Sequence, residues 1–175
     1  MRRRDLLVLS LLLPLAACDR GGQAQQLSIA PVPIGPDDEC AVCGMTIRAQ
    51  PGPKGQLFLT GQARPVKFCS TVDMFAFALQ PEHRGRIAAV YVHDMAGAAW
   101  DAPADERFVP AREAWFVAGG QQHGAMGRTL ASFHRRADAE AFGAERGGRP
   151  LAYDEVSLDV LRALRDGAGH QGKHS

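Results

Sequence analysis

The sequence has no apolar run long enough to cross a membrane and no excess of charge of one sign. Its main apolar run, residues 6–17, has about a dozen residues, whereas a membrane-spanning helix needs roughly twenty. The 175 residues carry 20 Lys and Arg against 19 Asp and Glu. Nothing in this near-neutral chain suggests the clustered basic face that binding to DNA or RNA requires, so we expect no nucleic-acid partner.

Familiar catalytic signatures are also missing. The chain has no Ser-His-Asp spacing, no pattern of paired carboxylates and no glycine-rich phosphate loop. The pair Gly119-Gly120 is too short a glycine run to indicate a nucleotide site. Nothing in the sequence therefore requires catalysis, and we expect a protein that is not an enzyme.

The N-terminus resembles a secretory signal. Arg2, Arg3 and Arg4 precede the short apolar run, which ends in Leu-Ala-Ala-Cys18. This ending matches the bacterial lipobox, in which a peptidase cuts before the cysteine and the thiol is lipidated. We predict a signal peptide over residues 1–17 and a lipid anchor at Cys18, which would hold the protein on the periplasmic side of the inner or the outer membrane.

A tether and a folded part follow the predicted anchor. Residues 19–38 are rich in Gly, Gln and Pro and lack helical periodicity. We predict a flexible tether over residues 18–38, with the folded part beginning near Glu39. The polar residues 167–175 predict a disordered tail.

The small number of cysteines is informative. If Cys18 is lipidated, three remain, namely Cys40, Cys43 and Cys69. In an oxidising compartment an odd number leaves at least one thiol unpaired or bound to something else. This is the first indication of a metal site.

A weak internal repeat indicates the fold class. Residues 68–77 align with residues 133–142, with Phe, Asp, Ala and Phe at the same offsets and Cys69 facing His134. Each copy follows short strand-like segments and begins a helix-like one. We predict an α+β fold of two similar ββαβ halves, about 39–100 and 111–156. A last helix, from about residue 157 to residue 166, follows the second half. The predicted domain therefore covers residues 39–166.

The motif Cys40-Ala-Val-Cys43-Gly44-Met45 is the strongest candidate for chemistry. Two residues between the thiols allow both sulfurs to turn toward one point, and Gly44 permits a tight bend. The thioether of Met45 is a third soft donor, and thiolates with thioethers select Cu(I), whereas zinc prefers four nitrogen or sulfur donors. A Cys40–Cys43 disulfide, a structural zinc site completed by Cys69 and a histidine, and a redox dithiol remain alternatives.

Three more residues are candidate ligands. Cys69 lies at a strand-to-helix boundary, where the helix N-terminus would lower its thiol pKa, although a small buried apolar residue is the alternative. Met126 lies in a glycine-flanked turn, so we predict that its thioether is presented rather than packed. His123 lies three positions earlier. We predict that this loop faces the same cleft as the Cys40–Met45 motif.

In this order, the motifs resemble the NosL-type lipoprotein copper chaperones of denitrifying bacteria. The resemblance covers most of residues 39–156 and rests on the lipobox at Cys18, Cys40–Met45, Val90–Asp94 with Trp100–Ala102, Ala114–Gly119, and Gly124–Gly127 leading into Leu130–Phe133. One departure is the loop Gly-Ala-Met-Gly, where the family commonly has Gly-Pro-Met-Gly.

The resemblance implies a membrane-anchored copper chaperone that delivers Cu(I) to apo nitrous oxide reductase, or to its assembly machinery, for the copper–sulfide centre. It also implies a fold similar to organomercurial lyase, and ligands from Cys40, Cys43, Met45 and Met126, without assigning roles to Cys69 or His123. A thiol enzyme, either a dithiol reductase or a lyase, and a zinc-stabilised structural lipoprotein are the alternatives, and zinc is a candidate second metal.

Overall fold

The computed structural model describes residues 29–169. The predicted signal peptide, the predicted lipidation site Cys18 and the last six residues of the predicted tail lie outside this range. Within the range, no helix combines the length and the apolar character that crossing a membrane requires.

Nine strands form two sheets and a hairpin in the described part of the chain. The first sheet has the order β2-β1-β3-β4 and consists of β1 (Gly55–Leu59), β2 (Val66–Phe68), β3 (Ile87–His93) and β4 (Phe108–Pro110). The second sheet has the order β8-β5-β9 and consists of β5 (Trp115–Ala118), β8 (Ala131–Phe133) and β9 (Arg149–Ala152). The hairpin consists of β6 (His123–Gly124) and β7 (Gly127–Arg128).

Four helices pack on these strands, which confirms the predicted α+β class. They are α1 (Thr71–Ala78), α2 (Pro81–Arg84), α3 (Arg136–Arg146) and α4 (Leu158–Gly169), beside the 3-10 turns η1 (Ile47–Ala49), η2 (Asp105–Arg107), η3 (Ala111–Glu113) and η4 (Tyr153–Glu155). Pro81 follows the end of α1 and also opens α2, because the first position of a helix needs no N–H donor.

The two sheets share one strand order. In each half the first strand is central, the second strand pairs on one side of it, and the strand that follows the helix pairs on the other side, always antiparallel. This common order, β2-β1-β3 and β8-β5-β9, accompanies the sequence repeat at residues 68–77 and 133–142. The predicted likeness to organomercurial lyase stays a prediction.

The folded part begins before Glu39. The main chain of Val32 exchanges two hydrogen bonds with the buried Gln56 side chain, at 3.0 and 2.8 Å, and Ile34 belongs to the core. The ammonium group of Lys67 donates to the carbonyl of Pro33. These contacts help to bury all five residues of β1, and they hold residues 32–34 against the first sheet, ahead of the start expected near Glu39.

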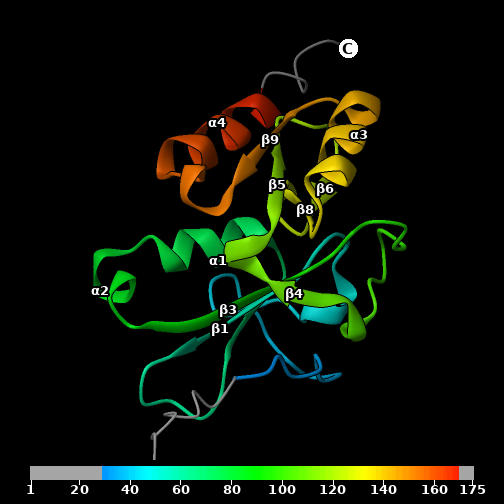
Figure 1. Cartoon of the computed structure of the whole chain (residues 1–175). Helices are drawn as coiled ribbons and strands as arrows, with labels where there is room; N and C mark the ends of the chain where they lie inside the picture. Colours follow the sequence, from blue (N-terminus) through cyan, green and yellow to red (C-terminus); the bar gives the residue numbers. More distant parts are fainter. Residues whose placement is uncertain (1–28, 170–175) are drawn as a thin grey trace, which may run out of the picture.

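One hydrophobic core joins the two halves. Phe75 of α1 meets Phe116 of β5 edge to face, with 4.9 Å between ring centroids, and Tyr153 lies 5.1 Å from Phe75. Leu161 and Leu164 of α4 belong to the same core. Figure 1 shows α1 between the first sheet and the second half of the molecule. A site at this border is therefore held by packed elements on both sides.

Candidate metal site

The Cys40–Met45 segment forms a closed turn. The N–H of Cys40 donates to the carbonyl of Met45 at 3.0 Å, and the N–H of Gly44 donates to the carbonyl of Cys40 at 2.8 Å. Gly44 has φ +73°, a conformation that glycine adopts without strain. The N–H of Ala41 donates to the carbonyl of Lys67, which ties the turn to β2. The turn therefore presents its thiols beside the end of this strand.

The start of α1 adds a third thiol and a carboxylate. The hydroxyl of Ser70 caps the helix by accepting the N–H of Asp73 at 3.1 Å. Cys69 precedes the cap and Asp73 lies in the first helical turn, so the two side chains are one turn apart. The Sγ of Cys69 lies 3.1 Å from the Oδ2 of Asp73. Helix capping thus fixes both groups in one place.

Four ligand atoms converge at this junction. The Sγ atoms of Cys40, Cys43 and Cys69 and a carboxylate oxygen of Asp73 all lie within 4.8 Å of one another. The three cysteines are free thiols, with 3.4 Å between the sulfurs of Cys43 and Cys69. Cys40 and Cys69 are buried, whereas Cys43 is only partly buried. We call these four residues the thiol cluster; its donor set suits a thiophilic metal ion.

The pKa values of the two buried thiols in the cluster are shifted in opposite directions. A hydrogen bond from Cys69, together with backbone N–H groups of Cys69, Cys43 and Val42, lowers the pKa of Cys40 to about 4 against the effect of burial. The pKa of Cys69 is raised by its hydrogen bond to Cys40, by burial and by Asp73. The expectation that the helix N-terminus would lower the pKa of Cys69 is therefore wrong, because its two acidic neighbours outweigh the helix.

Burial dominates the other two members of the thiol cluster. It raises the pKa of Cys43 and also that of Asp73. The Oδ2 of Asp73 is closer to the Sγ of Cys69, at 3.1 Å, than to that of Cys40, at 3.6 Å. Cys69 is therefore held as a thiol beside Asp73, and Cys40 is the thiol of the cluster whose pKa is lowered.

A cavity of about 530 Å³ opens between the two halves beside the thiol cluster. Its lining comes from the Cys40–Met45 turn, the start of α1, the hairpin and α4, namely Val42, Cys43, Val72, Asp73, Met126, Arg128, Leu161, Leu164 and Arg165. Met126 is 69% exposed at the tip of the hairpin. It lines the same cavity as Cys43.

Hydrogen bonds connect the hairpin and the residues that follow it to the first half of the molecule. The indole N–H of Trp100 donates to the carbonyl of His123 at 2.9 Å. The hydroxyl of Thr71, at the start of α1, donates to the carbonyl of Leu130 at 2.6 Å and lies 3.2 Å from the Thr129 hydroxyl. The start of α1 thus holds the chain where it leaves the hairpin.

The remaining sequence candidates are placed differently. Met45 is half-buried and packs against the main core, with its carbonyl closing the turn. The exposed His123 pairs with Arg128 across the hairpin and is absent from both the thiol cluster and the cavity lining. Asp73 was missed as a ligand, although its four-residue spacing from Cys69, one helical turn, was a usable signal.

Comparison with known proteins identifies the family. The NosL family model matches residues 31–161, most of the described range. The chain belongs to the NosL family. The copper-binding lipoprotein NosL of Stutzerimonas stutzeri is 41% identical over 170 residues, which cover 97% of this chain and 87% of the relative. The protein of the same name from Achromobacter cycloclastes is 38% identical over 159 residues, covering 89% and 81%.

A solved NosL structure has the same fold. The crystal structure of the copper chaperone NosL from Shewanella denitrificans superposes with a TM-score of 0.73 at 44% identity, covering 74% of this chain and 97% of that one. The family resemblance of the motifs is thereby confirmed. The names of these NosL relatives describe chaperones and binding proteins, which supports the non-enzymatic role expected from the sequence.

Proposed function

We propose that this protein is a copper chaperone that binds Cu(I) at Cys40, Cys43 and Cys69. The observation that carries the proposal is the convergence of three free sulfurs beside a cavity that Met126 also lines. Thiolates and thioethers are soft ligands and favour Cu(I) over harder cations. The names of the NosL relatives, which describe copper-binding proteins and a copper chaperone, support the choice of metal.

Binding of the metal by the thiol cluster requires its thiols to lose their protons. The lowered pKa of Cys40 favours the thiolate that a first contact with Cu(I) needs. Binding by Cys69 requires loss of its proton, and Asp73, 3.1 Å away, is the acceptor already in contact. Metal affinity should therefore rise with pH, since the ligands are thiolates.

Copper release is easiest toward the cavity, because part of the thiol cluster is accessible there. Cys40 and Cys69 are buried, whereas Cys43 and Met126 reach the cavity between the halves. A partner thiol or imidazole that enters from this side meets Cys43 and Met126 before it meets Cys40. We propose that copper leaves by stepwise ligand exchange along this path, and that Met45 and His123 have at most secondary parts in it.

The proposed destination and anchorage follow the family resemblance. Lipidation of Cys18 would hold the protein on the periplasmic side of a membrane, where two or more acyl chains anchor stably. The lipoprotein names of the relatives support this placement. We propose apo nitrous oxide reductase or its assembly machinery as the acceptor of the copper.

Zinc is the second candidate metal, because three sulfurs and one carboxylate oxygen supply the four donors of a closed zinc site. A redox dithiol fits less well. An attacking thiol must be both ionised and accessible, yet the ionised Cys40 is buried, and Cys43, the partly exposed thiol, has a raised pKa.

The test is an anaerobic Cu(I) titration of the purified protein against a competing chelator. We expect one-to-one binding that is strongly weakened in Cys43→Ser and unchanged in His123→Gln, with the metal-free protein folded throughout. Copper-loaded protein should then transfer copper to apo nitrous oxide reductase faster than the copper–chelator complex does. Failure to compete with the chelator, or unfolding on removal of zinc, would contradict the proposal.

A further inference from the structure

The large hydrophobic side chains that are exposed within residues 29–167 lie at one cavity. They are Val42, at 49% exposed, and Met126, at 69%. Both line the cavity beside the thiol cluster, Val42 from the Cys40–Met45 turn of the first half and Met126 from the hairpin of the second. Cys43, the partly buried thiol, belongs to the same lining. Apolar groups that are exposed together at the opening of a cavity are typical of a surface that binds another molecule.

Two arginines add positive charge to the same lining, Arg128 from β7 and Arg165 from α4. The Nη1 of Arg128 lies only 3.2 Å from the position that a Cβ on Gly167 would take, so its guanidinium group packs on the last turns of α4, which also carry Arg165. The C-terminal end of a helix stabilises positive charge of this kind. The Nε of Arg128 is buried and has no hydrogen-bond partner among the described residues. We call the four residues that combine exposed apolar surface with positive charge the cavity mouth, namely Val42, Met126, Arg128 and Arg165.

Negative charge in the lining does not balance these arginines. The acidic residue of the lining is Asp73, which is buried against Cys69 at 3.1 Å, and burial raises its pKa. Asp166 follows Arg165 in α4 and compensates at most one of the two guanidinium groups. The cavity mouth therefore keeps a positive charge that an incoming carboxylate meets.

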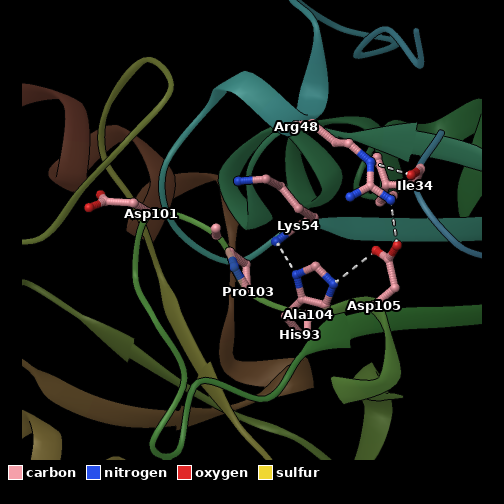
Figure 2. A pocket seen from close by; sticks show the side chains of 9 residues that line it. Ile34, Arg48, Lys54, His93, Asp101, Pro103, Ala104 and Asp105 are labelled. Carbon is pink, nitrogen blue, oxygen red and sulfur yellow. Dashed lines mark hydrogen bonds and ion pairs between the residues drawn. The ribbon is translucent and has the colours of Figure 1, made fainter. Parts of the chain in front are cut away.

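A second cavity, in the first half and of about 170 Å³, has neither property. Its cationic side chains are already engaged inside the protein. Arg48 pairs with Asp105 at 2.8 Å, as Figure 2 shows, and the ammonium of Lys54 donates to two main-chain carbonyls. No exposed large hydrophobic residue of the described chain lines this second cavity. Apolar exposure together with unbalanced charge therefore distinguishes the cavity mouth.

The cavity beside the thiol cluster is large enough to admit side chains of a partner. Its volume of about 530 Å³ lies within the range of about 300–1,000 Å³ that is usual for ligand pockets. A side chain that enters it meets apolar surface from Val72, Leu161 and Leu164 and finds Cys43 in the same lining. A thioether suits such a path, because it is apolar, flexible and a ligand of Cu(I). Carboxylates beside that thioether suit the guanidinium groups, which bind them through paired hydrogen bonds.

We propose that the cavity mouth docks an acidic segment of the protein that accepts the copper, a segment in which carboxylates flank a methionine. Arg128 and Arg165 pair with the carboxylates, and Val42 and Met126 pack around the methionine. Methionine and arginine are both enriched at the centres of protein interfaces. The docking surface rests on the proposed copper function and adds the chemistry of the partner to it.

The test uses the purified protein, with and without Cu(I), and two labelled peptides of equal length. One peptide carries a methionine flanked by four aspartates, and the other has asparagines in place of the aspartates. Fluorescence anisotropy should show that the aspartate peptide binds at least about tenfold more tightly, and that added salt reduces the difference. NMR should place its contacts at residues 40–45 and 123–128. Equal binding of the two peptides, or contacts elsewhere, would overturn the proposal.

Two charge reversals on α4 give the second arm of the test. Arg165→Glu should weaken binding of the aspartate peptide at least about tenfold without changing Cu(I) affinity. Arg162 is exposed, pairs with Asp159 and lies outside the cavity lining. Arg162→Glu changes the net charge equally, yet peptide binding should fall by less than about twofold at about 0.1 M salt, where distant charges are screened. Equal losses in the two variants would overturn the proposal.

Failure of the docking surface and failure of the copper function can be told apart. A protein that binds Cu(I) but does not distinguish the peptides keeps the copper function and loses the docking surface, whereas the reverse result keeps the surface alone. A lower Cu(I) affinity in Arg165→Glu would mean that this arginine balances the charge of the loaded thiol cluster, which overturns the proposal. Binding of anionic lipid vesicles without binding of the peptide would assign the surface to a membrane instead. If Arg165→Glu does not fold, the two peptides decide on the unmodified protein.

Discussion

The two halves of the molecule share a strand order but differ where the second strand meets the helix. In the first half Phe68 is followed by Cys69, which is fully buried, and by Ser70, whose hydroxyl caps α1. In the second half Phe133 is followed by an exposed His134, and α3 begins without a side-chain cap. The same topology therefore creates a candidate metal-binding position in one half and a solvated surface in the other. Burial and the identity of a few side chains make this difference.

The aspartates that align in the two halves show the same contrast. Asp73 is buried against Cys69 and Cys40, and burial raises its pKa. Asp138 forms an ion pair with Arg135 at 2.7 Å, and that contact lowers its pKa. One carboxylate is thus available to thiols, whereas the other stabilises a helix start at the surface.

The largest effect on Cu(I) affinity should come from replacing, in separate variants, the residue that follows the second strand in each half. Cys69→Ser should reduce Cu(I) affinity by more than the roughly 10–100-fold typical of an outer-shell change, because it removes a proposed ligand. His134→Ser, at the equivalent position, should leave affinity unchanged. Chelator competition measures both affinities, and circular dichroism checks that both variants fold. Equal affinities would mean that Cys69 only fills the core.

The aligned aspartates give the next comparison. Asp73→Asn keeps the shape of the side chain but removes the acceptor of the Cys69 proton, so Cu(I) affinity should fall about 10–100-fold at neutral pH. The loss should shrink at alkaline pH, where Cys69 ionises more readily. Asp138→Asn, which breaks only an exposed ion pair, should bind Cu(I) as the unmodified protein does. A similar loss in both variants would point to general destabilisation instead of proton transfer.

The pKa of Cys40 predicts a pH effect that belongs to the first half alone. Its thiol titrates at about 4 when folded, against 9.0 ordinarily. Between these values the unfolded chain binds one more proton, so this contribution to the free energy of unfolding of the metal-free protein rises with pH and is lost as pH falls through about 4. Cys40→Ser should remove this dependence, as followed by denaturant unfolding across the pH range.

Ultraviolet thiolate absorbance provides the control for this prediction. One thiolate should persist down to about pH 4 in the unmodified protein and in Cys43→Ser, but not in Cys40→Ser. An absorbance that vanishes below pH 8 in all three proteins would contradict the assignment of the thiolate.

Much of this arrangement is readable from the sequence. The α+β class follows from strand and helix periodicity, and the start of α1 follows from the Ser70 cap. The exposure of Met126 follows from its glycine-flanked turn, which leaves the thioether little to pack against. These are local signals, and each is set by a few neighbouring residues.

The remainder depends on contacts between distant segments. The packing of residues 29–38 on β1 follows from a side chain–backbone pair between Gln56 and Val32 that no local pattern marks. The raised pKa of Cys69 depends on Cys40, far away in sequence, and the helix rule alone gives the wrong sign. The burial of Lys54, whose ammonium donates to the carbonyls of Gln50 and Gly52, is visible only once the chain has folded around it.

The smallest expected effect concerns the one contribution of the second half to the proposed copper site. The hairpin β6–β7 is inserted in the chain between β5 and β8, and its tip carries Met126 to the cavity between the two halves. An exposed thioether adds a weak ligand, so Met126→Leu should lower Cu(I) affinity by less than about tenfold. It should slow copper transfer to an acceptor more than it weakens binding, because Met126 faces the exit path. Stopped-flow transfer to a copper chelator measures this rate.

The control lies on the same hairpin. His123→Gln alters an exposed side chain outside the cavity lining and should change neither affinity nor transfer rate. If Met126→Leu also changed neither, the two halves would be joined only by their shared core, and the copper site would belong entirely to the first half.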